Sequence, residues 1–265
     1  MKNEQQTVCF MCGKPLLETN VTKEHVFPKW LLQKCSLYDD NLSLVNGEKF
    51  PYRQLTIPCC RECNGGRMAA FENTIKAALL SGLESVKSLD ERILVWWLAK
   101  IFYAVRLKET TLNYSIKEQG AKKIINPSSL HRFQLIHFLM QALINDETFD
   151  ADPYEIFIFK SKEERFDYCD FAIGDVSLIQ LGDIICVCSF SSGGFCKDIL
   201  KNDISYLNSK ESIFPAQAYE FLFKMYWFIL QLNYSYDLVK IEQKNVLKIH
   251  HKEVDHFDFH ERETT

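Results

Sequence analysis

The chain has 265 residues, of which 47% are hydrophobic and 25% are charged, and its formal net charge is -4. This composition is typical of a folded protein with one or two domains and excludes a disordered chain. The negative net charge counts against a protein that coats nucleic acid. It does not exclude a nuclease, because a local basic cleft around a metal ion can bind the phosphate backbone.

The first six residues are polar and lack the apolar core of a signal peptide. The most apolar stretch, residues 221–232, contains Lys224 and is shorter than the roughly 20 residues that a membrane span needs. We therefore expect a buried helix there, no membrane span and a cytoplasmic location. In that reducing compartment, clustered cysteines indicate metal binding rather than disulfides.

The first 74 residues are rich in cysteines and loops. Pro28 suits the first turn of a short helix over residues 28–35. Asn46-Gly47 between apolar runs predicts a hairpin over residues 42–50 with a tight type I′ turn, and an extended stretch follows at 55–57. Apolar residues at helical spacing predict a helix from about residue 67 to Leu79.

The remaining chain, residues 75–265, predicts an α+β region that serves recognition, dimerisation or another accessory role. A helix over 89–108 is apolar around most of its circumference and is expected to be buried on several sides. The other expected elements are helices at 129–144 and 215–232, strands at 154–159, 166–173, 184–190 and 246–250, and a loop at 191–194.

Most side chains of these later elements are interpreted as core. The aromatic residues of the helices have helical spacing, which favours packing over a base-stacking platform; they are Trp96, Trp97, Phe102, Tyr103, Phe221, Tyr226, Trp227 and Phe228. The later cysteines lie in apolar, strand-like surroundings and are expected to be small buried hydrophobes; they are Cys169, Cys186, Cys188 and Cys196.

Two Cys-x-x-Cys knuckles carry the clearest chemical signal in the sequence. Cys9 and Cys12 form the first, Cys60 and Cys63 form the second, and glycines follow both. Two such pairs can supply four thiolates in the tetrahedral array that structural Zn²⁺ prefers. Cys59 is an alternative ligand to Cys60, although the two-residue spacing favours Cys60. We therefore predict one structural zinc ion.

Glu24 and His25 lie between the knuckles, within a stretch that ends in Pro28. A carboxylate can hold a divalent cation while a neighbouring imidazole deprotonates water. On a regular strand the two side chains would point to opposite faces, so one shared site requires an irregular strand or a mediated contact. Asn64 directly follows the second knuckle; its amide oxygen suits Mg²⁺ or Mn²⁺, and helix N-capping is its structural alternative.

Residues 22–30, followed by 58–68, resemble the HNH endonuclease family, in its zinc-stapled branch with a Glu-His-x-x-Pro motif and a later Cys-x-x-Cys-Asn. The resemblance covers about residues 9–72. It implies a ββα-metal fold in residues 1–74, in which a hairpin and a helix hold one divalent cation against the scissile phosphate. It further implies that His25 is the general base and that Glu24 and Asn64 bind the catalytic Mg²⁺ or Mn²⁺.

The chain departs from the family pattern at the middle position, where the family often has an asparagine that orients the histidine. Gln54, Asn41 and Asn46 are the available substitutes, and the sequence does not choose among them. Glu72 lies eight positions after Asn64 and would share its face of a helix, but a solvent-exposed carboxylate is its simpler interpretation.

Three basic residues flank the motif and are candidates for phosphate contacts, with surface solvation as the alternative for each: Lys29, Arg61 and Arg67. The histidine-rich tail, with His250, His251, His256 and His260, is interpreted as solvated rather than metal-binding.

The sequence thus predicts a metal-dependent endonuclease that acts on nucleic acid, with DNA favoured over RNA. By analogy with nucleases of this size, the expected setting is bacterial antiphage defence, restriction or a mobile element, and the expected partners are an ATPase or sensor subunit or a second copy of the chain. A non-catalytic zinc-knuckle module that binds nucleic acid or protein would need neither Glu24 nor His25. A zinc or redox sensor would use the cysteine pairs as switchable thiols.

Overall fold

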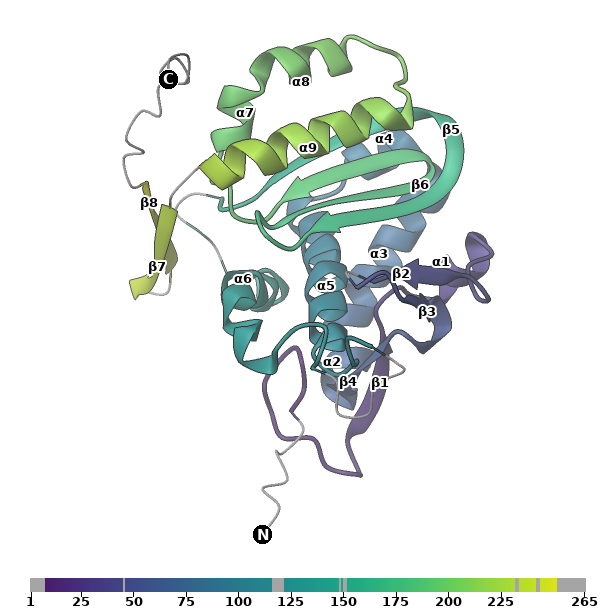
Figure 1. Cartoon of the computed structure of the whole chain (residues 1–265), viewed down its shortest axis with the longest axis vertical. Coiled ribbons are helices and arrows are strands. Elements are labelled where there is room, and N and C mark those ends of the chain that lie inside the picture. Colours follow the sequence, from purple (N-terminus) through teal and green to yellow (C-terminus); the bar gives the residue numbers. More distant parts are fainter. Residues whose placement is uncertain are drawn as a thin grey trace, which may run out of the picture.

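A computed structural model of the chain, shown in Figure 1, describes residues 8–44, 46–115, 122–147, 149, 152–231, 234–241 and 244–251. Helices and small antiparallel sheets alternate along these residues, so the expected α+β class is confirmed. No helix in the described ranges has the length and apolar character that crossing a bilayer requires.

The N-terminal part is organised around one pair of antiparallel strands. β1 (Val21–His25) pairs with β4 (Thr56–Cys60), and the helices α2 (Arg61–Gly65) and α3 (Arg67–Ser81) follow β4 directly. The chain between the two strands forms α1 (Lys29–Lys34), β2 (Asn41–Ser43), β3 (Lys49–Pro51) and the 3-10 turn η1 (Tyr52–Gln54). Two strands and a helix are therefore contiguous in space although 30 residues intervene between the strands.

The predicted hairpin at residues 42–50 is confirmed, but its turn differs from the prediction. β2 pairs with β3, with Leu42 opposite Phe50, and the backbone amide of Leu44 donates to the carbonyl of Glu48 at 2.9 Å. Only Gly47 of the Asn-Gly pair has a positive φ, at +79°, whereas a type I′ turn needs positive values at both positions. The turn is thus longer than the expected two-residue connection.

A central helix supports this unit from behind. α5 (Glu91–Glu109) follows the short α4 (Leu83–Lys87), and every residue from Leu94 to Arg106 is buried, as its all-round apolar pattern predicts. α6 (Gln134–Ile144) packs beside α5. The prediction began this last helix at residue 129, but η2 (Pro127–Phe133) occupies that stretch as a 3-10 segment.

The later part is a long two-stranded sheet covered by helices. β5 (Glu155–Phe171) pairs with β6 (Val176–Ser189); α7 (Phe195–Ile199), α8 (Lys201–Asn208) and α9 (Pro215–Gln231) cover one face, and α5 packs on the other (Figure 1). The two strands predicted at 154–159 and 166–173 are one strand. The charged residues 162–165, which lie between the two predicted strands, are exposed where the register shifts between Lys160 and Arg165.

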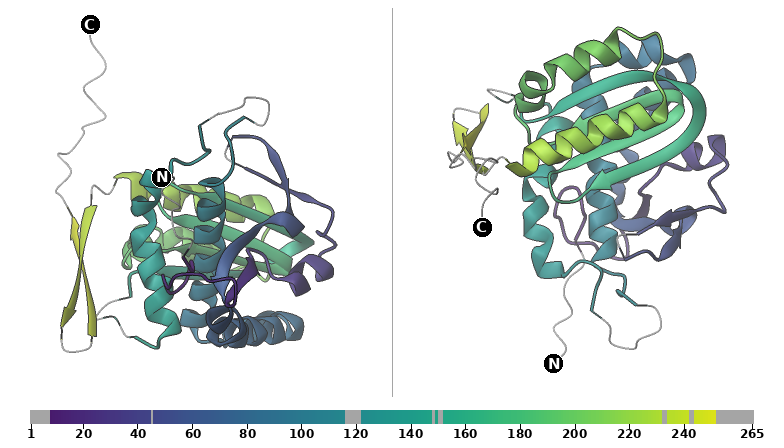
Figure 2. Two further views of the ribbon diagram at one scale, coloured as in Figure 1. Left: turned by 90° about the horizontal axis from the view of Figure 1, so that it is seen from below. Right: turned by 45° about the horizontal axis from the view of Figure 1, so that its top comes forward.

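β7 (Tyr234–Ile241) and β8 (Lys244–His251) form a separate hairpin beyond the end of α9, visible beside the main body in both views of Figure 2. β8 confirms the expected final strand, and its partner β7 was not predicted. His250 and His251 end β8, but their side chains, like all of His256 and His260, lie outside the described residues.

One hydrophobic core joins the N-terminal knuckles to α5, α6 and the inner face of β5–β6, and a second lies between that sheet and α9. Most of the aromatic residues expected in the core are there, but Trp227 is 55% exposed because it lies on the outer face of α9. Cys186, Cys188 and Cys196 are buried as expected, while Cys169 is only partly buried. The division into residues 1–74 and 75–265 stays a prediction.

A buried ion pair connects α5 to the sheet. The Nη2 atom of Arg106 donates to both carboxylate oxygens of Asp170 in β5, at 2.5 and 2.7 Å, and its Nη1 atom lies 3.1 Å from Glu109. The guanidinium is 3% exposed and Asp170 is 7% exposed. Burial alone lowers the pKa of Arg106, but the two carboxylates outweigh it and raise that pKa, so the pair stays ionised.

We expect Asp170→Ala to lower the free energy of unfolding by about 3–5 kcal/mol, because it leaves a buried guanidinium short of a counter-charge. Urea denaturation measures the change. The matched control is Asp167→Ala, whose carboxylate pairs with the partly exposed Arg165 and should contribute about 1 kcal/mol or less. Equal losses in the two variants would contradict a connecting role for the Arg106 pair.

Candidate functional site

The two cysteine knuckles meet at one point. The Sγ atoms of Cys9, Cys12, Cys60 and Cys63 all lie within 4.8 Å of one another, and Cys12 and Cys60 are 3.8 Å apart. Zn–S bonds of about 2.3 Å in a tetrahedron place sulfur atoms about 3.8 Å apart. The four thiols therefore fit a tetrahedral metal ion such as zinc, and the expected ligand set is confirmed as a cluster.

Local backbone geometry prepares the second knuckle. Cys60 ends β4 and is the N-cap of α2, and its sulfur accepts the backbone amide of Cys63 at 3.4 Å. Three residues later the chain passes so close to itself that a Cβ atom on Gly66 would lie 2.5 Å from the carbonyl oxygen of Glu62. Glycine is therefore required at the junction of α2 and α3.

Cys59 is a near neighbour of the cluster but is not part of it. Its sulfur lies 3.8 Å from that of Cys9, and it is fully buried. The hydrogen bond from the Cys59 thiol, opposed by burial and supported by backbone amides, lowers the pKa of Cys9 to about 3. Burial is the largest of the causes that raise the pKa of Cys12. One thiol is thus readily ionised, and a bound cation would favour ionisation of the others.

Helix α6 holds the first knuckle in place, which the sequence gave no sign of. The Nε2 atom of His137 lies 2.6 Å from the carbonyl oxygen of Phe10, and the side-chain amide of Gln141 donates to the carbonyl of Met11 at 2.7 Å. Because the partner of His137 is a carbonyl, its Nε2 carries the proton. Burial lowers the pKa of His137, so the ring is neutral at pH 7.

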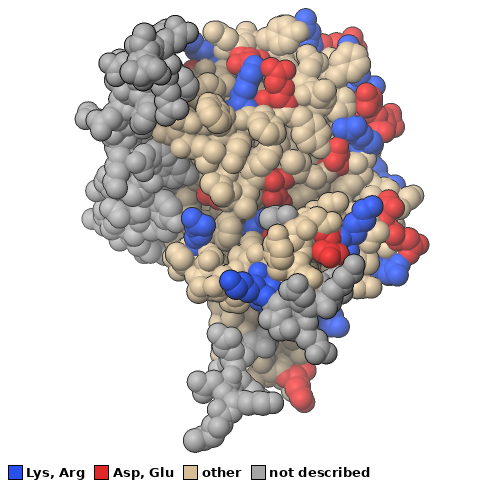
Figure 3. All heavy atoms as spheres, in the orientation of Figure 1, with Lys and Arg blue, Asp and Glu red and all other residues tan. Residues whose placement is uncertain are grey.

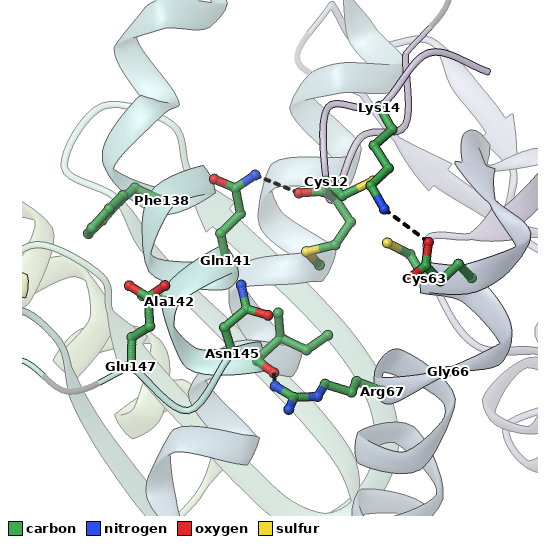
Figure 4. A pocket seen from close by; sticks show the side chains of 13 residues that line it. Cys12, Lys14, Cys63, Gly66, Arg67, Phe138, Gln141, Ala142, Asn145 and Glu147 are labelled. Carbon is green, nitrogen blue, oxygen red and sulfur yellow. Dashed lines mark hydrogen bonds and ion pairs between the residues drawn. The ribbon is translucent and has the colours of Figure 1, made fainter. Parts of the chain in front are cut away.

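A cavity of about 730 Å³ lies beside the cluster, between the knuckles and α6. Figure 4 shows Cys12 and Cys63 on one side, and Phe138 and Gln141 of α6 with its C-cap residue Asn145 on the other. Arg67 lines it and donates to the carbonyl of Ile144, and its second partner is Asp146 at 3.5 Å. All three predicted phosphate-contact residues, Lys29, Arg61 and Arg67, are exposed, and Arg67 already has these two partners within the protein.

Glu24 and His25 end β1 and face different environments. Glu24 is 7% exposed, opposite Ile57, whereas His25 is half-buried, opposite Thr56. Burial lowers the pKa of His25, as do the positive charges of Lys29 and Lys100, and Glu72 opposes them. The imidazole is therefore neutral at physiological pH, which is the form that a general base needs.

The carboxylate of Glu24 is paired with a lysine that sequence reasoning missed. Lys100 of α5 is fully buried, and its ammonium group donates to Glu24, to Glu72 of α3 at 2.7 Å and to the backbone carbonyl of His25 at 2.8 Å. Glu72 is only 18% exposed, so its interpretation as a solvent-exposed carboxylate was wrong. The apolar helix pattern hid Lys100, because one lysine does not disturb it.

Asn64 lies on the same side of β1 as Glu24. Its amide nitrogen donates to the hydroxyl of Thr22 at 3.0 Å, and the bond leaves the amide oxygen, which is the potential ligand atom, uninvolved. Thr22 and Glu24 are two residues apart on a strand, so their side chains share a face at a spacing of about 7 Å. Asn64 belongs to the last turn of α2, whose N-cap is Cys60, so the alternative of an N-cap was wrong.

None of the candidates for the middle position is bonded to His25 in the described residues. Gln54 and Asn41 are exposed. The side chain of Asn46 already has two partners: its amide nitrogen donates to the carbonyl of Tyr114 at 2.7 Å, and its oxygen accepts from the backbone amide of Glu48. The residue directly opposite His25 is Thr56.

The charged side chains of the described residues are interspersed in sign on the face drawn in Figure 3. No family model, curated protein or solved structure matches the chain.

We expect the purified chain to carry one zinc ion and Cys12→Ser to lose both the metal and the fold of the knuckle unit. The apparent binding free energy of a structural zinc, about 10–16 kcal/mol, is as large as the stability of a whole domain. Elemental analysis and circular dichroism measure the two effects. Cys35→Ser, which changes a half-buried cysteine outside the cluster, should keep the zinc.

We expect Gln141→Leu and His137→Leu each to speed the loss of zinc to a chelator, because each leaves a knuckle carbonyl without its partner at a cost of about 1–3 kcal/mol. Zinc release is followed with a chromogenic chelator. Gln134→Leu, an exposed change on the same helix, is the control. Equal release rates in all three variants would show that α6 does not hold the knuckle.

Proposed function

We propose that the chain is an HNH-type endonuclease that hydrolyses phosphodiester bonds of nucleic acid, with DNA as the first substrate to test. In this proposal His25 is the general base, and Glu24 and Asn64 bind a catalytic Mg²⁺ or Mn²⁺. The proposed module is the β1–β4 pair with α2 and α3, stapled by zinc between the knuckles.

The observation that carries the proposal is the shared face of β1. Asn64 bonds to Thr22, whose side chain shares the face of β1 with that of Glu24 at a spacing of about 7 Å along the strand, and His25 follows Glu24 as the last residue of β1. A carboxylate and an amide oxygen thus come from two segments 40 positions apart in sequence, Glu24 and Asn64. Because β1 pairs regularly through His25, we propose that its neutral imidazole acts from the neighbouring face of the strand through a water molecule. These are the groups that metal-assisted hydrolysis needs.

The chemistry follows from the states of the side chains. The neutral imidazole of His25 can accept a proton from a water molecule as that water attacks phosphorus. A bound divalent cation would stabilise the charge that develops on the phosphate and on the leaving oxygen. Lys29 and Arg61 are exposed and able to contact phosphates of the backbone.

We propose that residues 75–265 recognise the substrate, a partner such as an ATPase or sensor subunit, or a second copy of the chain. The proposed biological setting is one such as antiphage defence or restriction.

One observation favours a second candidate, a zinc-knuckle module without catalysis. Glu24 forms an ion pair with Lys100, and a carboxylate that already has a cation partner is a weaker ligand for another. Only one of its two oxygens is used in that pair, however, because Lys100 binds Oε1. The two candidates therefore differ in whether the second oxygen binds a divalent cation.

Cleavage of plasmid DNA in the presence of Mg²⁺, Mn²⁺ or Ni²⁺ tests the proposal, with EDTA as the blank. We expect His25→Ala to reduce single-turnover cleavage by about 10²–10⁴-fold, the usual contribution of a general base. His131→Ala, an exposed histidine of η2, should cleave at the wild-type rate. Melting curves of the same preparations exclude unfolding as the cause. A loss below about tenfold in a folded His25→Ala protein rules out the assignment.

The pH dependence of the cleavage rate is a second test of His25 as the general base. Because burial, Lys29 and Lys100 lower the pKa of His25, its base form persists below pH 6.5. The cleavage rate should therefore rise through a midpoint below 6.5 and stay level above it. A midpoint above 6.5 would contradict the environment that the structure gives to His25.

A further inference from the structure

Lys100 makes the most unusual set of contacts in the described part of the chain. Its side chain is 0% exposed, and an ammonium group has three N–H donors, all of which are used: on Glu24, on Glu72 and on the carbonyl oxygen of His25. A buried charge is strongly unfavourable unless it is paired and hydrogen-bonded, and Lys100 satisfies both conditions.

The three acceptors come from two elements that the proposed active site uses. Glu24 and the carbonyl of His25 belong to the end of β1, and Glu72 belongs to α3, which continues from the helix of Asn64. Lys100 itself comes from the middle of α5, far away in sequence. Its ammonium group therefore links β1 to α3, at the end of β1 that carries His25.

The acceptor set has the chemistry of a divalent-cation site. Two carboxylate oxygens and a backbone carbonyl oxygen are hard ligands of the kind that Mg²⁺, Mn²⁺ and Ca²⁺ take from proteins. Here a nitrogen cation fills their centre. Since Lys100 binds only the Oε1 atom of Glu24, the Oε2 atom is free of this contact.

We infer that Lys100 is a resident cation of the candidate active site: it occupies the place of a divalent ion between Glu24 and Glu72, and it positions the end of β1. This inference rests on the proposed function for the role of Glu24 in catalysis. It adds that the site takes one divalent cation rather than two, and that this cation binds the Oε2 atom of Glu24, which Lys100 does not contact. Lys100 is thus a positioning residue that acts through Glu24 and His25.

The charge of Lys100 is maintained by its surroundings. Burial alone lowers the pKa of Lys100, but the carboxylates of Glu72 and Glu24 outweigh that effect and the pKa lies above its usual value. Burial also raises the pKa of Glu24 against the attraction of Lys100, so removal of the ammonium would leave the buried carboxylate of Glu24 beside the partly buried one of Glu72, and the two would repel each other. Such a vacancy should attract a divalent cation.

The experiment compares zinc-loaded wild-type protein with Lys100→Met and counts bound Mn²⁺ by isothermal titration. We expect Lys100→Met to bind one Mn²⁺ more than the wild type, and Mn²⁺ to restore part of its lost melting temperature. Lys100→Met/Glu72→Gln should lose the additional ion. The control is Lys108→Met, since Lys108 is also on α5 and half-buried but donates to the carbonyl of Thr56 and pairs with no described carboxylate; it should bind as many ions as the wild type.

The difference in the number of bound Mn²⁺ ions between Lys100→Met and the wild type tests the inference. The number of ions bound by the wild type, together with plasmid cleavage, tests the proposed function. A wild type that binds no Mn²⁺ and a Lys100→Met protein that binds one would refute the catalytic assignment and retain the resident cation. A folded Lys100→Met protein with no additional ion overturns the inference. If Lys100→Met is recovered only unfolded, it is refolded with and without Mn²⁺ and the folded fractions are compared. Failure of Mn²⁺ to increase the folded fraction overturns the inference.

Glu72→Gln in the wild-type background supplies an independent check. If Glu72 serves Lys100, the variant should bind the same number of Mn²⁺ ions as the wild type. The loss of one ion on this change alone would assign Glu72 to the divalent cation and contradict the inference.

Discussion

The meeting of two cysteine pairs 48 positions apart is the contact on which the N-terminal architecture depends. Cys9 and Cys12 arrive on a loop, while Cys60 and Cys63 straddle the end of β4 and the start of α2. A metal ion held by all four closes the intervening chain as a cross-link does, and this constrains the unfolded state. The same contact fixes where β4 ends, and it therefore places Asn64, the neighbour of Cys63, against β1.

Helix α5 supplies aromatic packing and a buried charge to the N-terminal strands and helices. The strands of that unit have three to five residues and bury little surface, but Trp97 of α5 stacks on Trp30 at 6.5 Å and Trp96 contacts Phe71 edge-on at 5.2 Å. Aromatic pairs of this kind dominate core energetics. The same helix carries Lys100, so both the packing and the charge balance of the candidate site depend on residues beyond position 74.

The sequence predicted local features well and long-range pairings poorly. The knuckles, the central helix and the 42–50 hairpin follow from spacing and turn chemistry, which act over a few residues. Lys100 and Glu72 could not be paired in this way, because one lysine of α5 and one glutamate of α3 have no local signature of a contact between them. His137 has the same difficulty: its partner, the carbonyl of Phe10, is a backbone group that every residue possesses.

The turn at Asn46-Gly47 and the strand β5 show how tertiary context overrides local preference. Asn46 bonds to the carbonyl of Tyr114, from the segment after α5, and this contact competes with the backbone conformation that a type I′ turn requires. In β5, the charged residues 162–165 separate the two predicted strands, but pairing with β6 on either side keeps the strand continuous.

The charge count around Glu24 explains why one lysine is accompanied by two carboxylates. A buried carboxylate without a partner tends to become protonated, and a neutral acid is a poor ligand for a divalent cation. A single carboxylate fully neutralised by Lys100 would hold its charge but would exert little net attraction on a further cation. With Glu72 added, the cluster has a formal charge of one negative unit. Lys100 lowers the pKa of Glu24, although burial and the neighbouring charge of Glu72 raise it. In surroundings that are less polarisable than water, that residual charge attracts a cation more strongly than an exposed carboxylate can. The burial of Glu24 is therefore compatible with a role in binding a metal ion, provided that Lys100 and Glu72 act together.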